Sequence, residues 1–419
     1  MYRNKGTITV FLSLISMLFL SLFCTMAESV RVQAARFQAA AAFDMGLFSI
    51  FGEYDRVLLE EYDLWFLDGS SEEQKIREVL ETKLEKYIQP NINPRYNLAA
   101  GRSWDVFPTE LDRCTVDKYA LATDHGGQVF YSQAVENQKE LFVGEAASAL
   151  KKNIKQMEEG HQKGEEYQNE EQKADEEYQR AQAAQMEEKK RQESEKENAE
   201  KQEESDTDIK ETEAVQAKVE NPLDQIKKIK SMGILGLVLK DGTVVSDKTI
   251  ERKDLPSERN LQKGSLLVDE ISADPVSEAI FLNYLQKHFQ CAVDEGGKHQ
   301  KGSKEHSLSY ELEYIIGGQK SDRENLKKTV NRILLIREGM NYATLAKSAK
   351  MRGEAMALAA AITGAAALPE FAGALQKLLM LAWAYGESLL DVRTLLAKGK
   401  VPMLKAETEW KLPLEKLGM

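Results

Sequence analysis

The feature that most constrains this chain is an uncharged, apolar stretch near its N-terminus. Residues 6–27 carry no charged side chain, and residues 8–27 read ITVFLSLISMLFLSLFCTMA. A helix needs about 20 apolar residues to cross a hydrocarbon layer of ~30 Å. Residues 7–45 contain no glycine or proline, so the apolar stretch and the alanine-rich segment after it are expected to form one helix about 58 Å long. The stretch predicts a transmembrane helix.

Two kinds of cleaved signal are alternatives to this anchor. A secretory signal has an apolar core of about 7–15 residues and small residues at its cleavage site. The core here is longer, although Val32-Gln33-Ala34 offers a small-residue exit. A lipoprotein signal needs a small residue before its cysteine, whereas Phe23 precedes Cys24. An uncleaved or N-terminally trimmed single-pass anchor therefore fits the sequence best.

The flanking charges predict the orientation of the anchor. Arg3 and Lys5 precede the apolar stretch, and the positive-inside rule places such a basic end in the cytoplasm. The bulk of the chain is then extracytoplasmic. Membrane helices associate through close packing and polar side chains. The residues expected to make such contacts are Ser13, Ser16, Ser21, Glu28 and Arg31.

Above the membrane, the same helix keeps one stripe of small and apolar residues. The stripe recurs at helical spacing at Val30, Ala34, Phe37 and Ala41. Alanine side chains are short and let another helix come close. We therefore expect this part of the helix to pack against a neighbour.

Composition limits the remaining possibilities. A chain of 419 residues has room for two modest domains beyond the anchor. Its net charge of −12 argues against nucleic acid as a partner, because phosphate binding needs a basic surface. Three cysteines are too few for a disulfide-built scaffold. Cys24 lies in the apolar stretch, and Cys114 and Cys291 are interpreted as free thiols, with a disulfide between them as the alternative.

The charged middle of the chain, residues 151–220, differs from both sides. It holds 22 acidic and 13 basic residues and few apolar ones, which keep no apolar heptad. Such a segment buries too little surface to form a core of its own. It is expected to be either disordered or a solvated helix held by Glu–Lys pairs, acting as a spacer. The predicted organisation is an N-terminal tip and transmembrane helix (1–27), a membrane-proximal α+β region (28–150), a charged linker (151–220) and a distal helix-rich domain (221–419).

The predicted fold class is α+β and helix-rich, with a few short strands. Residues 96–134 alternate and are rich in Tyr, Val and Phe, and residues 308–316 (LSYELEYII) alternate as well, so both are interpreted as strands. Residues 233–239 read as a strand or a buried turn. Helices are expected to begin at Pro222, Pro275 and Ser321, where Ser321 and Glu324 form a capping box.

A search for chemistry finds no catalytic or metal motif in the sequence. His288, His299 and His306 surround Cys291 with a spacing that fits no zinc pattern. Glu387 and Asp391 are four residues apart, which places both carboxylates on one helix face. Paired carboxylates can perform acid–base catalysis, but an ion network is favoured. Its expected members are Tyr314, Ser321, Glu324, Asn325, Arg337, Asn341, Trp383, Glu387, Asp391 and Arg393. No catalytic residue, metal or cofactor is predicted.

The N-terminus resembles a known class of surface protein. Lys5, Gly6 and the uncharged helix after them resemble the start of pilin-like and TadE/TadF-like proteins of tight-adherence (Flp) pilus systems. In those proteins prepilin peptidase cuts the chain directly after the glycine. The corresponding cleavage site in this sequence lies between Gly6 and Thr7. The sequence departs from the pattern at Phe11, where most such proteins carry a glutamate. The resemblance implies a pseudopilin-like subunit.

The distal part resembles a family of unknown function from Gram-positive (Firmicutes) bacteria. The resemblance rests on YELEYIIGGQKSDRENL, on LLIREGMNYATL, and on LAWAYGESLLDVRTLLAKGKVPMLK with a late Trp410. The opening KGTITVFLSLI and the pattern of Glu28, Ser29 and Arg31 also resemble that family. The similar regions are roughly 1–60 and 221–412. The resemblance implies single-pass proteins that tend to be encoded beside tight-adherence pilus genes, and it brings no enzymatic activity.

The expected function is therefore that of a non-enzymatic, membrane-anchored component of a pilus or related surface assembly. Its expected partners are the membrane and other assembly subunits, bound through the N-terminal helix. One alternative is a surface sensor or ligand-binding protein that uses the distal domain. A further alternative is a cell-wall enzyme.

Overall fold

The computed structural model divides the chain into two units. The first comprises Met1–Glu140 with Asn260–Ser272, and the second comprises Leu141–Arg259 with Ala273–Met419. The structure describes residues 5–68, 76–92, 96–98, 102–104, 109–139, 145–200, 221–240, 242–251, 253, 263–266, 274–293, 306–365 and 368–417. The two units are taken in turn.

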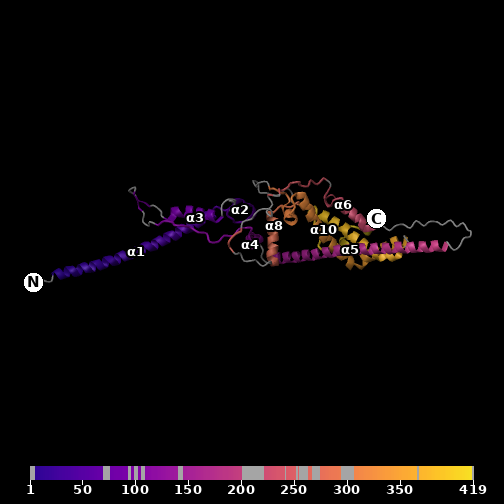
Figure 1. Cartoon of the computed structure of the whole chain (residues 1–419), viewed down its shortest axis with the longest axis horizontal. Coiled ribbons are helices and arrows are strands. Elements are labelled where there is room, and N and C mark those ends of the chain that lie inside the picture. Colours follow the sequence, from indigo (N-terminus) through magenta and orange to yellow (C-terminus); the bar gives the residue numbers. More distant parts are fainter. Residues whose placement is uncertain are drawn as a thin grey trace. The chain divides into compact units, whose positions relative to one another are not determined.

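The first unit begins with α1 (Lys5–Phe51), an unbroken helix of 47 residues (Figure 1). The continuous helix expected from the sequence is confirmed. Residues 6–51 contain a window that is long and apolar enough for a single membrane span or a signal sequence. None of that window is buried against other parts of the chain.

The upper part of α1 packs against α3 (Ile76–Ile92). Ala42 and Ile50 of α1 are buried in one cluster with Leu84 and Ile88 of α3. Gly46 makes the close approach possible, because a β-carbon there would lie 2.5 Å from Cγ1 of Ile88. This packing face is not the stripe expected from the sequence, because Val30 is 68% exposed and Phe37 is 76% exposed.

The remainder of the first unit is short elements and irregular chain. It contains α2 (Arg56–Tyr62), the antiparallel strands β1 (Tyr96–Leu98) and β2 (Arg102–Trp104), and α4 (Asp124–Lys139). Residues 263–266 return to this unit, where the Gly264 amide donates to Oδ1 of the Asp124 carboxylate at 2.9 Å.

The strand prediction for residues 96–134 is thereby largely wrong. Only two strands of three residues occur there among the described residues, and α4 occupies the end of the range. Gly126 and Gly127 form a break near the start of α4, with positive φ at His125 (51°), Gly126 (71°) and Gly127 (91°).

The second unit is a helical assembly around α10 (Figure 1). Its helices are α5 (Glu145–Glu200), α6 (Pro222–Ser231), α7 (Ile234–Val238), α8 (Pro275–His288), α9 (Glu311–Gly317), α10 (Asp322–Lys347), α11 (Ala349–Ala365) and α12 (Ala372–Leu396). Short 3-10 turns follow at Pro369–Phe371, Glu407–Glu409 and Leu414–Lys416. The expected α+β class is thus corrected, because the described residues are almost entirely helical where they are regular.

The expected strand at residues 308–316 is the helix α9. Alternation over so few residues does not separate a strand from a helix, and the ends of the segment decide the outcome. Glu311 and Glu313 lie in the first helical turn, where carboxylates are favoured by the helix dipole. Gly318 ends the helix with a left-handed conformation (φ 62°). Residues 234–238, interpreted as a strand or buried turn, form the short helix α7.

The expected solvated spacer is a core helix over residues 145–200. α5 packs along α10 and also contacts α12 and α8. Tyr167, Ala174 and Tyr178 of α5 are buried in the same cluster as Leu334 of α10 and Leu381 of α12. The prediction that this segment is helical is therefore confirmed for residues 145–200. The prediction that it is a solvated spacer outside any hydrophobic core is wrong for these residues. Residues 201–220 lie outside the described residues.

Glycines explain how so polar a helix approaches α10 so closely. A β-carbon on Gly339 of α10 would lie 2.3 Å from the carbonyl carbon and oxygen of Lys163. On the opposite side, Gly164 of α5 meets Leu335 of α10, and Gly160 meets Ile336. The two helices therefore touch backbone to backbone at Gly339, and no larger residue fits there.

This contact can be tested with a matched pair of substitutions. Gly339→Ala should destabilise the second unit by ~1–3 kcal/mol, because overpacking against a backbone forces the helices apart. Gly353→Ala is the control, since Gly353 lies inside α11 with open space around its Cα. Alanine there should gain up to about 1 kcal/mol of helix propensity. Thermal unfolding followed by circular dichroism measures both, and equal effects of the two changes would contradict the close contact.

Candidate functional site

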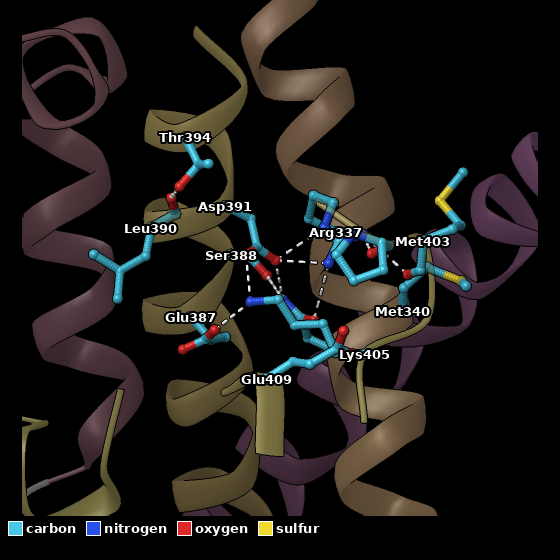
Figure 2. A network of polar contacts seen from close by, with 12 residues as sticks. Arg337, Met340, Glu387, Ser388, Leu390, Asp391, Thr394, Met403, Lys405 and Glu409 are labelled. Atoms are coloured by element: carbon cyan, nitrogen blue, oxygen red, sulfur yellow. Dashed lines mark hydrogen bonds and ion pairs between the residues drawn. The ribbon is translucent and has the colours of Figure 1, made fainter. Parts of the chain in front are cut away.

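The strongest concentration of buried charge lies between α10 and α12 (Figure 2). Arg337 and Asn341 are four residues apart on α10, so both point toward the same neighbour. Glu387 and Asp391 occupy matching positions on α12 and are completely buried. We call this group, together with Lys405, the buried ion network.

Arg337 connects the two helices and the chain that follows them. Its Nε and Nη2 donate to Oδ2 of Asp391 at 3.0 and 2.7 Å. Its Nη1 donates to the carbonyl oxygens of Pro402 and Met403, both at 2.9 Å. Asn341 Nδ2 donates to the same Asp391 oxygen at 3.0 Å. One guanidinium therefore fixes α12 and the segment after α12 to α10.

Lys405 supplies the second cation of the network. Its ammonium group contacts the carboxylates of both Glu387 and Asp391. Glu387 also accepts hydrogen bonds from the backbone amides of Lys411 (3.1 Å) and Leu412 (2.8 Å). Two buried carboxylates are thus matched by two buried cations, which is the condition under which charges are tolerated in a protein interior.

This arrangement acts as a clasp for the C-terminal segment, residues 402–412. The carboxylate oxygens face side chains and amides of the chain itself, and Glu387 and Asp391 have no exposed surface. A solute reaches them only if the segment lifts away. The geometry therefore fits a structural role better than acid–base chemistry.

The structure brings together only part of the expected network. Arg337, Asn341, Glu387 and Asp391 meet, whereas the other six expected members lie elsewhere. Asn325 contacts Gln319, and Tyr314 is half-buried on α9. Trp383 Nε1 donates to the Leu412 carbonyl at 2.7 Å, and Arg393 Nε donates to that of Leu237 at 2.5 Å.

Two members of the network were missed. Lys405 and Ser388 were not among the expected residues, although Ser388 accepts from Asn341 Nδ2 at 2.9 Å. Charge balance could have indicated a residue such as Lys405, because two buried carboxylates on one helix face need two cations and the expected network supplied only Arg337 beside them. Ser388 stands beside Glu387 in sequence, and the sequence shows nothing further that would have marked it.

The other expected positions have local roles. Ser321 is the N-cap of α10 and accepts from the Glu324 amide at 3.2 Å. On α1, Ser13 donates to the Val10 carbonyl at 2.8 Å, and Glu28 pairs with Arg31 at 3.1 Å. The remaining positions lie on the exposed surface of α1: Gly6, Thr7, Ser16 and Ser21.

The sequence places His288, His299 and His306 around Cys291 with a spacing that fits no zinc site. His306 pairs with Glu311 at 2.5 Å, and His288 packs on the Tyr284 ring. His299 lies outside the described residues. Within the described part of the chain, no group of three potential ligands is placed to hold a metal ion. Cys24 and Cys114 are free thiols.

A second buried polar site surrounds Glu338 of α10. Burial raises the pKa of its carboxyl from 4.5 to about 8, with Lys230 opposing this shift and Glu171 adding to it. Burial also raises the pKa of the neighbouring Tyr385 to about 12. Lys230 Nζ lies 5.1 Å from the centre of the Tyr385 ring. Glu338 therefore carries a proton at neutral pH, and the site is a neutral acid among aromatic rings.

A surface pocket of about 310 Å³ lies beside α7 and the end of α12. Its floor is apolar and includes Val238 and Leu326, and three cationic residues line it: Lys240, Arg393 and Lys398. Its volume is at the lower end of the range for small-molecule sites.

The distal helices match a known family model. Residues 212–419 fit a family of unknown function, DUF5702. These residues form a DUF5702 domain. The expectation of a domain of unknown function is confirmed here, while the connection to pilus genes stays a prediction. Neither the curated proteins nor the solved structures contain a match to the chain.

The DUF5702 match includes the buried ion network, Glu338 and the pocket. It begins after the described part of α5 ends at residue 200. The buried tyrosines of α5, Tyr167 and Tyr178, are therefore outside the match although they belong to the same core. The structural unit is larger than the DUF5702 domain.

The buried ion network makes a quantitative prediction. Arg337→Met should cost ~3–5 kcal/mol, because it leaves a buried carboxylate short of its partner. Arg323→Met is the control, since Arg323 pairs with Asp247 at 2.7 Å on the surface, where both side chains are more than half exposed. Surface pairs contribute little, so this change should have a much smaller effect. Urea unfolding measures both.

A double substitution distinguishes charge from packing. Arg337→Met combined with Asp391→Asn removes one cation and one anion together, leaving Lys405 with Glu387. The double variant should be less destabilised than the sum of the single variants. Strict additivity would contradict a coupled network.

Glu338 predicts a pH dependence of stability. Its pKa is about 8 in the folded chain and 4.5 in the unfolded reference, so the folded state binds the extra proton between these values. The unfolding free energy should therefore fall as pH rises from about 4.5 to about 8. Glu338→Gln should flatten this decline, and Glu354→Gln on the surface of α11 should leave it unchanged. Melting temperatures between pH 5 and pH 9 measure the slope, and an equal slope in all three proteins would contradict the assignment.

Proposed function

We propose that this chain is a single-pass, non-enzymatic component of a bacterial surface assembly, anchored in the membrane by α1. The observation that carries the proposal is the continuity of α1. The apolar lower part and the part that packs on α3 are one helix without a break. The anchor is therefore part of a folded unit and not a segment joined to it by a tether.

This continuity favours an anchor over a cleaved signal. The small-residue exit at Val32-Gln33-Ala34 lies in the middle of α1, where each amide is engaged in helical hydrogen bonding. A signal peptidase would have to unwind the helix to cut there. Cleavage would also leave a shortened helix on α3.

A tight-adherence (Flp) pilus is the assembly that we propose. The support is the resemblance of Lys5, Gly6 and the uncharged helix to TadE/TadF-like proteins. Two buried polar sites of the second unit are consistent with a structural domain, because one fixes the C-terminal segment and the other is a neutral acid in a core. The distal DUF5702 domain would then contact other subunits and catalyse no reaction.

The N-terminus of the native, membrane-extracted protein tests this proposal. Mass spectrometry should find the chain beginning at Thr7 when a prepilin peptidase is present and at Met1 when it is absent. The protein should resist alkaline carbonate extraction in both cases, because the helix remains. A start near Ala35 would overturn the anchor, and an unchanged Met1 in the presence of the peptidase would overturn the pseudopilin-like role.

A further inference from the structure

The Lys405 side chain ends between two carboxylates that solvent does not reach. Its Nζ contacts Oε1 of Glu387 and Oδ1 of Asp391 (Figure 2). The Lys405 side chain is 2% exposed, and the side chains of Glu387 and Asp391 are 0% exposed. An amine and a carboxyl group are the two reactants of an amide bond, and the exclusion of water protects such a bond from hydrolysis.

The two carboxylate oxygens of Asp391 have different surroundings. Oδ2 accepts hydrogen bonds from Nε and Nη2 of Arg337 at 3.0 and 2.7 Å and from Nδ2 of Asn341 at 3.0 Å. Oδ1 contacts Lys405 and has no hydrogen-bond partner among the described residues. Donors aimed at one oxygen stabilise the negative charge that develops there when the carboxyl carbon is attacked. Oδ2 is therefore placed to carry that charge, and Oδ1 is placed to leave.

Glu387 is placed to move protons beside the Lys405 amine. The backbone amides of Lys411 and Leu412 donate to its Oε1 and Oε2 at 3.1 and 2.8 Å and so hold the carboxylate in position. Lysine becomes a nucleophile when it loses its proton, and removal from water favours the neutral amine. A carboxylate in contact with the nitrogen can accept a proton from it during attack.

We propose that Lys405 and Asp391 form an isopeptide bond within the folded chain. Lys405 first passes a proton to Oδ1 of Asp391, which gives a neutral amine and a neutral carboxyl group. Nζ then bonds to Cγ of Asp391, and Glu387 takes a proton from the nitrogen and returns it to Oδ1. The Cγ–Oδ1 bond breaks and one water molecule leaves. The reaction happens once in each chain and needs no oxidant or reductant.

The charges of the buried ion network favour this reaction. Two cations and two carboxylates are buried before it, and each of these charges carries a desolvation cost. The bond removes the charges of Lys405 and Asp391 together. Arg337 and Glu387 remain as one cation and one anion, so the site stays balanced. Oδ2 becomes the oxygen of the new amide and keeps its hydrogen-bond donors.

The bond would hold the C-terminal segment to α12 covalently. It would close a loop between residues 391 and 405 and so restrict the unfolded chain. The inference goes beyond the proposed function, and it holds whether or not α1 is a membrane anchor.

The intact mass of the denatured full chain tests the bond. The wild-type chain should be lighter than its sequence by the mass of one water molecule. Lys405→Arg should have the full mass of its own sequence, because a guanidinium keeps its proton and does not attack. Both proteins are made in the same cells, so any trimming of the N-terminus lowers both masses equally. A wild-type chain of full mass overturns the proposal, whatever the variant does.

Peptide mapping shows where the water is lost. Trypsin should leave the chain uncut after Lys405 and release one branched peptide in which residues 378–393 are joined to residues 401–411. Asp241-Gly242 is a sequence that can lose water by forming a cyclic imide. A water lost there, with cleavage after Lys405 and no branched peptide, overturns the proposal.

A pair of glutamine variants tests the role of Glu387. Glu387→Gln keeps the size of the side chain and cannot take the proton, so the branched peptide should fall several-fold. Glu354→Gln is the control, because Glu354 lies on the surface of α11 and should leave the bond intact. An undiminished branched peptide in Glu387→Gln overturns the role of Glu387 as the proton carrier.

Discussion

The backbone contact between α5 and α10 is the constraint on which the second unit depends. Because Gly339 has no side chain, α10 lies directly against Lys163 and Gly164. Only at this separation does Tyr167 reach across to α12, where its hydroxyl donates to the Leu381 carbonyl at 3.1 Å. A helix with mostly charged residues therefore contributes its few aromatic ones to the centre of the core. The helices of the DUF5702 domain pack against α5, although α5 lies outside the matched residues.

The second unit buries charge in two different ways. In the buried ion network, two cations match two carboxylates, and the desolvation cost is offset by short contacts to side chains and amides. Among the described residues no ion pair with Glu338 occurs, and burial raises the pKa of its carboxyl to about 8, so the group avoids the cost by keeping its proton. The first solution makes the C-terminal segment dependent on α10 and α12. The second makes the packing of α5, α6 and α12 around α10 less stable as pH rises from about 4.5 to about 8.

The sequence predicted those parts of the fold that depend on local signals. The unbroken α1, the Ser321 cap and the helices that begin at Pro222 and Pro275 all follow from residues close together in the chain. The sequence does not show α5 as a core helix when only large apolar residues are counted as packing residues. Gly160, Gly164, Tyr167, Ala174 and Tyr178 do follow a heptad spacing once glycine and alanine count as packing residues. Lys405 was missed because its partners are far away in the sequence.

The two sides of α1 place different demands on one helix. The side toward α3 needs small residues for close packing in water, and Ala42 and Gly46 meet that demand. The opposite side leaves Phe37 and Phe48 exposed, and their burial against a partner would be favourable. Because α1 is continuous through the membrane segment, whatever binds along it also fixes the direction of the packed upper part. A partner bound along this helix would therefore order the first unit as well as the anchor.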